Sequence, residues 1–215
     1  MSLIENVRAA ASSAGGAVLG TGARAVAAAR PATKPLHPRG VVLLGRLHRH
    51  GLDSPTGVTW LDEAGEDEVM VRRSRAIGLP GALPDIHGLA VRVPAGDSRY
   101  GDLLFASTGW GRIGRFVLTA SRDPGGRPLT TLLPYRAPAG PVLLGARAAG
   151  TEEFELSCAV GAGEWRPFAD LRLTPTASDP AISFDPVRNR IPGLEQYGWI
   201  TRLREPSYRV ARRAR

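Results

Sequence analysis

The stretch FELSCAV, residues 154–160, carries the clearest structural signal in the chain. Every second residue from Phe154 to Val160 is apolar, and the residues between them are Glu155, Ser157 and Ala159. A period of two is typical of a β-strand with one face on a core and the other toward solvent. This stretch therefore predicts a strand, with its apolar side directed inward.

Similar short runs recur from residue 41 to about residue 175. Each is bounded by Gly, Pro, Asp or Ser, at intervals of very roughly ten to fifteen residues. The runs are VVLLGRL, EVMVRRSRAI, LAVRVP, DLLFAST, RFVLTAS, LTTLLPYR, PVLLGAR, FELSCAV and ADLRLT. Many short strands with Gly/Pro turns predict a mainly β protein, either an antiparallel sandwich or a barrel.

The two ends of the chain differ from the β region in composition and periodicity. Residues 1–33 are rich in alanine but interrupted by glycines, which predicts a weak helical arm rather than an independent domain. The β region is expected to span 34–180. Residues 181–215 are expected to form a C-terminal segment of loop with one final helix starting near Pro206.

Composition limits the environment and the partners. The 215 residues include one cysteine, Cys158, so an intrachain disulfide is impossible and a cytoplasmic, reducing location is expected. No apolar run is long enough for a membrane span, and the start of the chain lacks the features of a signal peptide. The net charge is +8, but residues 202–215 hold six arginines and one acid, so +5 of it lies in that tail. Three interpretations of the tail are open. It can be a solvated end, a cluster that binds phosphates, or a group of arginines that keeps a neighbouring tyrosine ionised.

Common catalytic signatures are missing. There is no G-x-S-x-G, P-loop or C-x-x-C motif. His48 and His50 form an H-x-H pair without acidic or cysteine partners at metal-binding spacing, so a metal site there is not expected. The four tryptophans are core or rim residues in the simplest interpretation, and the floor of a ligand cavity in the alternative.

Two short motifs with polar residues lie near the start of the predicted β region. KPLHPRG (34–40) resembles the catalase-superfamily pattern R-V-V-H-A-[RK]-G, so His37 falls on the distal histidine and Lys34 on an arginine that meets a haem propionate. MVRRSRAIG (70–78) is similar to V-R-F-S-T-V-x-G in that family. Arg72 then falls on a second propionate-binding arginine, and Ser74 on the serine that hydrogen-bonds the distal histidine.

Two later segments resemble the same family in the same order, and GEWRPFADLRL (163–173) is similar to one of its barrel strands. DIHGLAVRVPAGDSRYGDLLFAST (85–108) and SFDPVRNRIPGLEQYGWITRLREPSYRVARRAR (183–215) match at Asp85, Gly88, Ala90, Asp102, Leu103, Thr108, Phe184, Asp185, Pro186, Pro192, Gly193, Glu195, Arg204, Ser207 and Tyr208. In the last of these, Tyr208 falls on the axial haem ligand and Arg204 on the arginine that bonds its phenolate. Arg215 falls on a third propionate arginine, with Arg212 as its competitor.

The resemblance covers residues 34–215 and implies a catalase-like antiparallel β-barrel that binds haem b through Tyr208. It implies that His37 acts as a general base on peroxide and that Ser74 orients it. Lys34, Arg72 and Arg215 would neutralise the propionates, since buried charges need partners.

The departures from the family shape the expected activity. Ala106 aligns with the distal asparagine, with Ser107 next to it, and His87 stands where the family has arginine. We therefore expect peroxidase or organic-peroxide chemistry on a small hydrophobic substrate rather than fast disproportionation of hydrogen peroxide. A homodimer is expected, because a small barrel without accessory domains exposes surface. The alternatives are a haem-free relative that binds another ligand or a partner, a polyanion-binding protein that uses the tail, and a hydrolase, for which no nucleophile–base pair is found.

Overall fold

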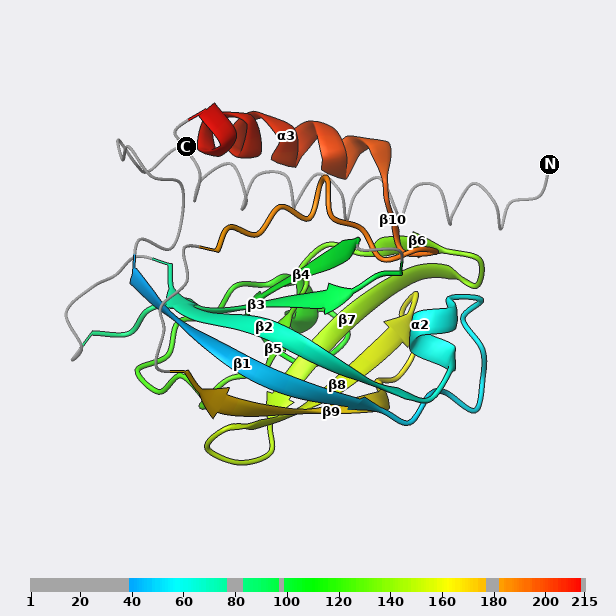
Figure 1. Cartoon of the computed structure of the whole chain (residues 1–215), viewed down its shortest axis with the longest axis horizontal. Helices are drawn as coiled ribbons and strands as arrows, with labels where there is room; N and C mark the ends of the chain where they lie inside the picture. The colour runs from blue at the N-terminus through cyan, green and yellow to red at the C-terminus, as the bar shows by residue number, and fades with distance from the viewer. Residues whose placement is uncertain (1–38, 77–82, 97–98, 177–181, 214–215) are drawn as a thin grey trace. The chain divides into compact units, whose positions relative to one another are not determined.

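In the computed structural model the chain forms a closed barrel of antiparallel strands (Figure 1). The structure describes residues 39–76, 83–96, 99–176 and 182–213, and these lie in one compact unit, Lys34–Arg215. The predicted arm, residues 1–33, lies outside the described residues. The strands are β1 (Arg39–Arg49), β2 (Gly65–Arg75), β3 (His87–Pro94), β4 (Tyr100–Ser107), β5 (Leu129–Thr130), β6 (Tyr135–Ala137), β7 (Gly140–Ala148), β8 (Glu153–Val160), β9 (Arg166–Pro175) and β10 (Glu195–Gln196).

Strand pairing closes the sheet on itself. The order β7-β5-β4-β3-β2-β1-β9-β8 is completed by pairing of β7 with β8, and β6 and β10 extend the sheet beside β7. The described pairings are all antiparallel. Of the two predicted architectures, the barrel is therefore confirmed.

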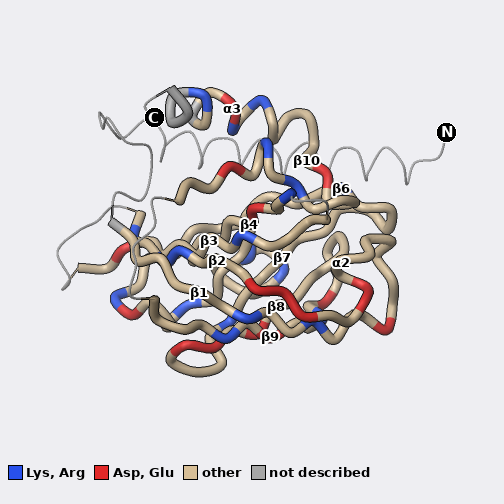
Figure 2. Tube along the Cα trace, viewed as in Figure 1, with Lys and Arg blue, Asp and Glu red and all other residues tan. Residues whose placement is uncertain are grey.

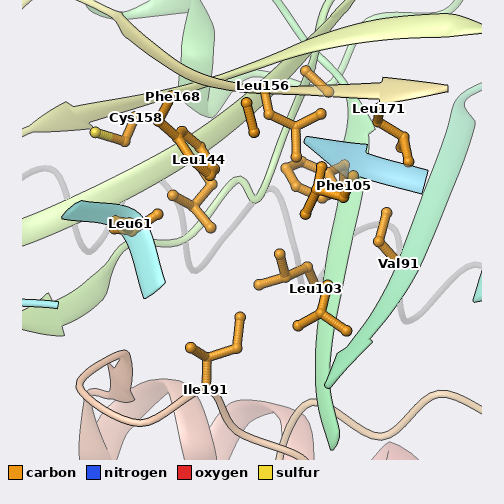
Figure 3. Close-up of a cluster of buried hydrophobic side chains, with 14 of the residues drawn as sticks. Leu61, Val91, Leu103, Phe105, Leu144, Leu156, Cys158, Phe168, Leu171 and Ile191 are labelled. Carbon is orange, nitrogen blue, oxygen red and sulfur yellow. The ribbon is translucent and has the colours of Figure 1, made fainter. Parts of the chain in front are cut away.

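Alternation along the strands fills the barrel with apolar side chains. In β8, Phe154, Leu156 and Cys158 belong to the core cluster, as predicted (Figure 3). The expected solvent face of this strand is wrong, because Ser157 and Ala159 are also buried. Ser157 pairs with Gly145 of β7, and the indoles of Trp110 and Trp165 lie over that glycine. The barrel wall is therefore covered on its outside here as well.

Two of the predicted strand runs are interrupted. RFVLTAS contains no strand: a 3₁₀ turn, Gly114–Phe116, occupies its start, because the buried Arg115 donates to the carbonyls of Gly111 and Gly163. LTTLLPYR is divided into β5 and β6 because Leu132 has a φ of 60°, a left-handed conformation that a strand cannot contain.

The final helix is longer than predicted. Helix α3 (Gly198–Arg213) begins eight residues before Pro206 and contains that proline in its interior. An internal proline costs a helix about 3 kcal/mol, so the first turns depend on tertiary packing. Ile200, only 1% exposed, supplies that packing on the barrel side of the helix.

The two ends of the barrel are built differently. At one end lies the short helix α2 (Thr59–Asp62), in which Leu61 is fully buried (Figure 1). Ile191, from the segment before β10, packs directly against Gly101 at the start of β4 and so fills the same end. We call this the closed end. The opposite end, where β1 begins and β2 finishes, contains a cavity and is called the open end.

Candidate functional site

One row of residues across the outside of the barrel consists of small side chains. Gly40 pairs with Ser74, Ser74 with Gly88, and Gly88 with Ala106, so the row runs from β1 to β4. These positions alternate with core residues such as Leu89 and Phe105 and therefore face outward. The result is a nearly flat face with Ser74 as its only hydroxyl-bearing residue among these four.

Arg72 stands in the next row of the same outer face. It pairs with Val42 on one side and Ala90 on the other. Its guanidinium crosses Gly40, where an added Cβ would lie 2.9 Å from the Arg72 Cζ. Two of the predicted site residues, Arg72 and Ser74, are thus on one face because they are two positions apart on one strand.

Three further predicted site residues are not among the described residues. His37, Lys34 and, at the far end of the chain, Arg215 lie outside the described residues. Their roles stay predictions.

Position 106 differs from the family pattern in a way that the neighbouring serine does not repair. Ala106 faces outward, whereas Ser107 faces into the barrel and is 1% exposed. The Ser107 hydroxyl donates to the Thr119 carbonyl at 2.6 Å and accepts from the His87 amide at 3.0 Å. No polar side chain therefore takes the asparagine position from residue 106 or 107.

Arg204 and Tyr208 are one turn apart on α3, so they lie on the same side of the helix. Burial raises the pKa of the Tyr208 phenol to about 12; the Arg204 guanidinium opposes this, while Asp185, Tyr135 and Asp102 add to it. The influence of Asp102 on this phenol indicates that Tyr208 lies near the outward-facing side of β4.

Tyr135 is a member of this group that sequence reasoning missed. It is 5% exposed, and its hydroxyl has no hydrogen-bond partner among the described residues. Burial raises the pKa of this phenol, and nearby Arg204 lowers it. Its stretch, LTTLLPYR, has the pattern of an ordinary strand, so no sequence signal marks it.

A buried ion pair anchors the segment before α3. Arg92 donates to both Asp102 oxygens, at 2.7 and 2.8 Å. The Asp102 Oδ2 also accepts from the Asp185 amide and from Asn189 Nδ2, each at 2.6 Å. Arg92 donates to the Ser183 carbonyl as well. Asp102 and Asp185 were among the family matches, but their direct link was not predicted.

The two histidines of the H-x-H pair lie beside different carboxylates. His48 lies 3.4 Å from Glu66, and His50 lies 3.5 Å from Asp170. In the part of the chain that the structure describes, no cluster of three or more potential ligands could hold a metal ion.

Three of the four tryptophans pack against other aromatic rings, Trp199 is exposed, and none of the four lines either described cavity. Trp60 meets Phe168 edge-on, and Trp110 stacks on Trp165 with centroids 4.2 Å apart. The core-or-rim interpretation fits these three.

The basic charge of the C-terminal segment follows α3 (Figure 2). Part of it is balanced within the helix, where Arg209 lies 3.9 Å from Glu205. No helix in the described ranges is both long and apolar enough to cross a membrane.

Solved catalases have the same fold as this chain. It aligns with catalase A from Saccharomyces cerevisiae at a TM-score of 0.58 and 10% identity, covering 87% of this chain and 61% of that one. A fungal catalase aligns at a TM-score of 0.58 and 11% identity, with 87% and 60% covered. The chain thus spans about three fifths of the length of these catalases. No family model matches the chain, and neither does any curated protein.

Proposed function

We propose that this chain is a haem b protein of catalase type that reacts with peroxides, with Tyr208 as its axial ligand. The observation that carries the proposal is the outer face of β1–β4. There Gly40, Gly88 and Ala106 form a row of small side chains beside Arg72 and Ser74, and Tyr208 of α3 lies near Asp102 on the outward-facing side of β4.

The chemistry of these residues suits a haem. A flat macrocycle packs well on small side chains, and Arg72 offers a fixed positive charge and a fork of donors to a propionate. Arg204 beside Tyr208 favours the phenolate, the form that binds iron. Binding of iron would replace the proton of this phenol, so affinity would rise with pH.

Roles of the chain's own residues follow from this arrangement. Haem, when bound, supplies redox chemistry toward peroxides. His37 would accept a proton from the peroxide and return it to the departing oxygen, and Ser74 would orient its ring. Lys34 and Arg215 would complete the charge balance around the propionates.

Ala106 favours oxidation of a small hydrophobic organic donor over fast disproportionation of hydrogen peroxide. The polar group that the family places there is missing, and Ser107 is directed inward and already hydrogen-bonded. Ala106→Asn is therefore expected to raise oxygen evolution from hydrogen peroxide. Ala90→Asn, one row away on the same face, is expected to leave it unchanged.

The first experiment is an absorption spectrum of protein expressed with a haem precursor. We expect a Soret band that is displaced or lost in Tyr208→Phe and retained in Tyr100→Phe, a control whose side chain is exposed. A band unchanged by Tyr208→Phe would exclude this tyrosine as the ligand, and a colourless wild type that also refuses added haemin would exclude haem binding.

One observation favours the haem-free alternative. With its pKa near 12, the Tyr208 phenol is neutral at physiological pH, and the carboxylates of Asp102 and Asp185 act against the phenolate. In that case the barrel would bind another ligand or a protein partner. Haem titration separates the two proposals.

Homodimerisation, a cytoplasmic location and the lack of specific nucleic-acid binding stay predictions. Light scattering at several protein concentrations tests the first. A DNA mobility shift, with and without Arg209→Gln, tests the third.

A further inference from the structure

The open end of the barrel contains a cavity whose inward-facing residues the haem proposal does not use, although its lining also includes Gly40, Ser74 and Gly88 of the outer face. Its volume is about 270 Å³, close to the lower limit of about 300 Å³ for small-molecule sites. It is lined by Gly40, Val41, Arg73, Ser74, Arg75, His87, Gly88, Leu89, Pro124, Leu129 and Phe154. Most of these are the inward-facing residues at the ends of their strands.

Two arginines occupy positions where the strand pattern would place core residues. Val69 and Val71 of β2 are buried in the core, and the next inward positions are Arg73 and Arg75. Arg73 pairs with Glu152 at 3.0 Å, and Arg75 lies 3.5 Å from Asp85. Neither carboxylate is among the described lining residues. Both guanidinium groups are therefore ion-paired with residues outside the described lining, which itself holds no acid.

Arg75 retains an unsatisfied donor at this site. Its Nε is buried and makes no hydrogen bond among the described residues, but it lies 3.5 Å from Oδ2 of the Asp85 carboxylate. Its Nη2 donates to the Leu83 carbonyl at 2.9 Å. A guanidinium carries five N–H donors, and the described contacts of Arg75 use Nε and Nη2, which leaves Nη1 for an oxygen of a bound anion.

The rest of the wall is apolar. Leu129 and Phe154 are 3% and 4% exposed and form the inner part, while Val41 on the rim is 62% exposed. His87 donates Nε2–H to the Ser121 carbonyl at 2.9 Å, which fixes its ring. An inorganic dianion would leave these apolar walls uncovered, whereas a monoanion with an apolar body would cover them.

We propose that the open-end cavity binds a small monocarboxylate with an apolar body, of about the size of benzoate or hexanoate. A volume of 270 Å³ corresponds to roughly nine water molecules at about 30 Å³ each. The carboxylate would lie at Arg73 and Arg75 and the body against Leu89, Leu129 and Phe154. This site is part of the barrel itself and goes beyond the proposed haem function, on which it does not rest.

Calorimetric titration of the full chain without haem, with benzoate as the probe, tests the proposal. We expect the double variant Arg73→Gln/Arg75→Gln to weaken binding by about tenfold or more, because charge-assisted hydrogen bonds are lost. The matched control is Arg46→Gln/Arg172→Gln, which removes the same charge from two paired residues on the outer face. Its affinity should equal that of the wild type. Benzamide, which lacks the charge, should bind the wild type more weakly than benzoate.

A second variant keeps the test independent of the folding of the arginine variants. Val41→Trp would fill the exposed rim and should abolish benzoate binding without lowering the melting temperature. The proposal is overturned if benzoate fails to bind the wild type, if both arginine doubles weaken it equally, or if benzamide binds as tightly. Since haem is absent throughout, these outcomes are separate from failure of the haem proposal.

Discussion

The closed and open ends of the barrel each direct arginines inward, but they use them differently. At the closed end Arg49 donates to Asp67 of β2 and to the carbonyls of Trp60 and Glu63 in and after α2. Its guanidinium is therefore hydrogen-bonded within the protein. At the open end Arg75 lies 3.5 Å from Asp85 and donates Nη2 to the Leu83 carbonyl, which leaves its Nη1 without a described partner beside a cavity. The same residue type is thus a structural clamp at one end and a candidate ligand contact at the other.

What differs between the ends is the chain available to cover them. Helix α2 and the segment with Ile191 close one end, and Asp102 holds that segment in place through Asp185 and Asn189. A buried polar group is stable when the chain supplies its partners. Where the chain does not, the group is available to a ligand.

The largest expected effect comes from removing the anchor of the closed end. Asp102→Ala leaves the partly buried Arg92 without its carboxylate partner and releases the segment before α3, which should cost about 3 kcal/mol of unfolding free energy. Chemical denaturation measures this, and hydrogen exchange should increase around Ile191. Asp53→Ala, an exposed site with the same charge change, is the control; equal losses in the two variants would contradict this role.

The second-largest effect on stability is expected when the pH is raised, because Tyr208 on α3 then loses its proton. Burial raises the pKa of Tyr208 to about 12, above the ordinary value of about 10. The folded state therefore holds its proton longer than the unfolded state, so its contribution is complete below pH 10 and is lost as pH rises toward 12. The loss of unfolding free energy is up to about 3 kcal/mol when the pKa in the folded state lies about 2 above that in the unfolded state.

Denaturation of the haem-free protein at pH 9 and pH 12 measures this loss. Tyr208→Phe should reduce it, while part remains because burial also raises the pKa of Tyr135. If the variant loses as much stability as the wild type, Tyr208 is not the residue responsible.

Arg49→Gln should produce an intermediate effect. It removes charge-assisted bonds to Asp67, Trp60 and Glu63, each of which contributes on the order of 1.5–3 kcal/mol at most. Since the variant retains part of the side chain, we expect a total loss of about 2 kcal/mol in thermal or chemical unfolding.

Arg73→Gln at the open end should have the smallest effect on stability. Its ion pair with Glu152 is about a third exposed, 29% and 40% for the two side chains, and such pairs contribute less than about 1 kcal/mol. The comparison between the ends requires Arg49→Gln to be the more damaging of the two, measured under the same conditions. A reversed order would show that the open end is as tightly built as the closed one.

Sequence patterns predicted correctly those features that depend on the residues of a single strand. Alternation in residues 154–160 identified β8, and the two-residue spacing of Arg72 and Ser74 required them to share a face. The spacing of Arg204 and Tyr208 placed them together once the helix existed. The start of that helix was wrong because Pro206 is a local signal, whereas burial of Ile200 is not.

Other features depend on residues that are distant in the chain. The inward direction of Ser107 follows from its position in β4, but its use by Thr119 and His87 depends on how the following loop returns. Tyr135 joins Arg204 and Tyr208 only because β6 lies near α3. No local pattern indicates either contact.

The sequence by itself determined most of the strands and which residues of each strand share a face, because side-chain direction has a period of two in any strand. Only the tertiary structure decided that the sheet closes on itself, that one end is filled by α2 and Ile191, and that the other retains a cavity with two arginines. Those outcomes depend on which distant segments supply the missing partners, and that is a property of the packed chain.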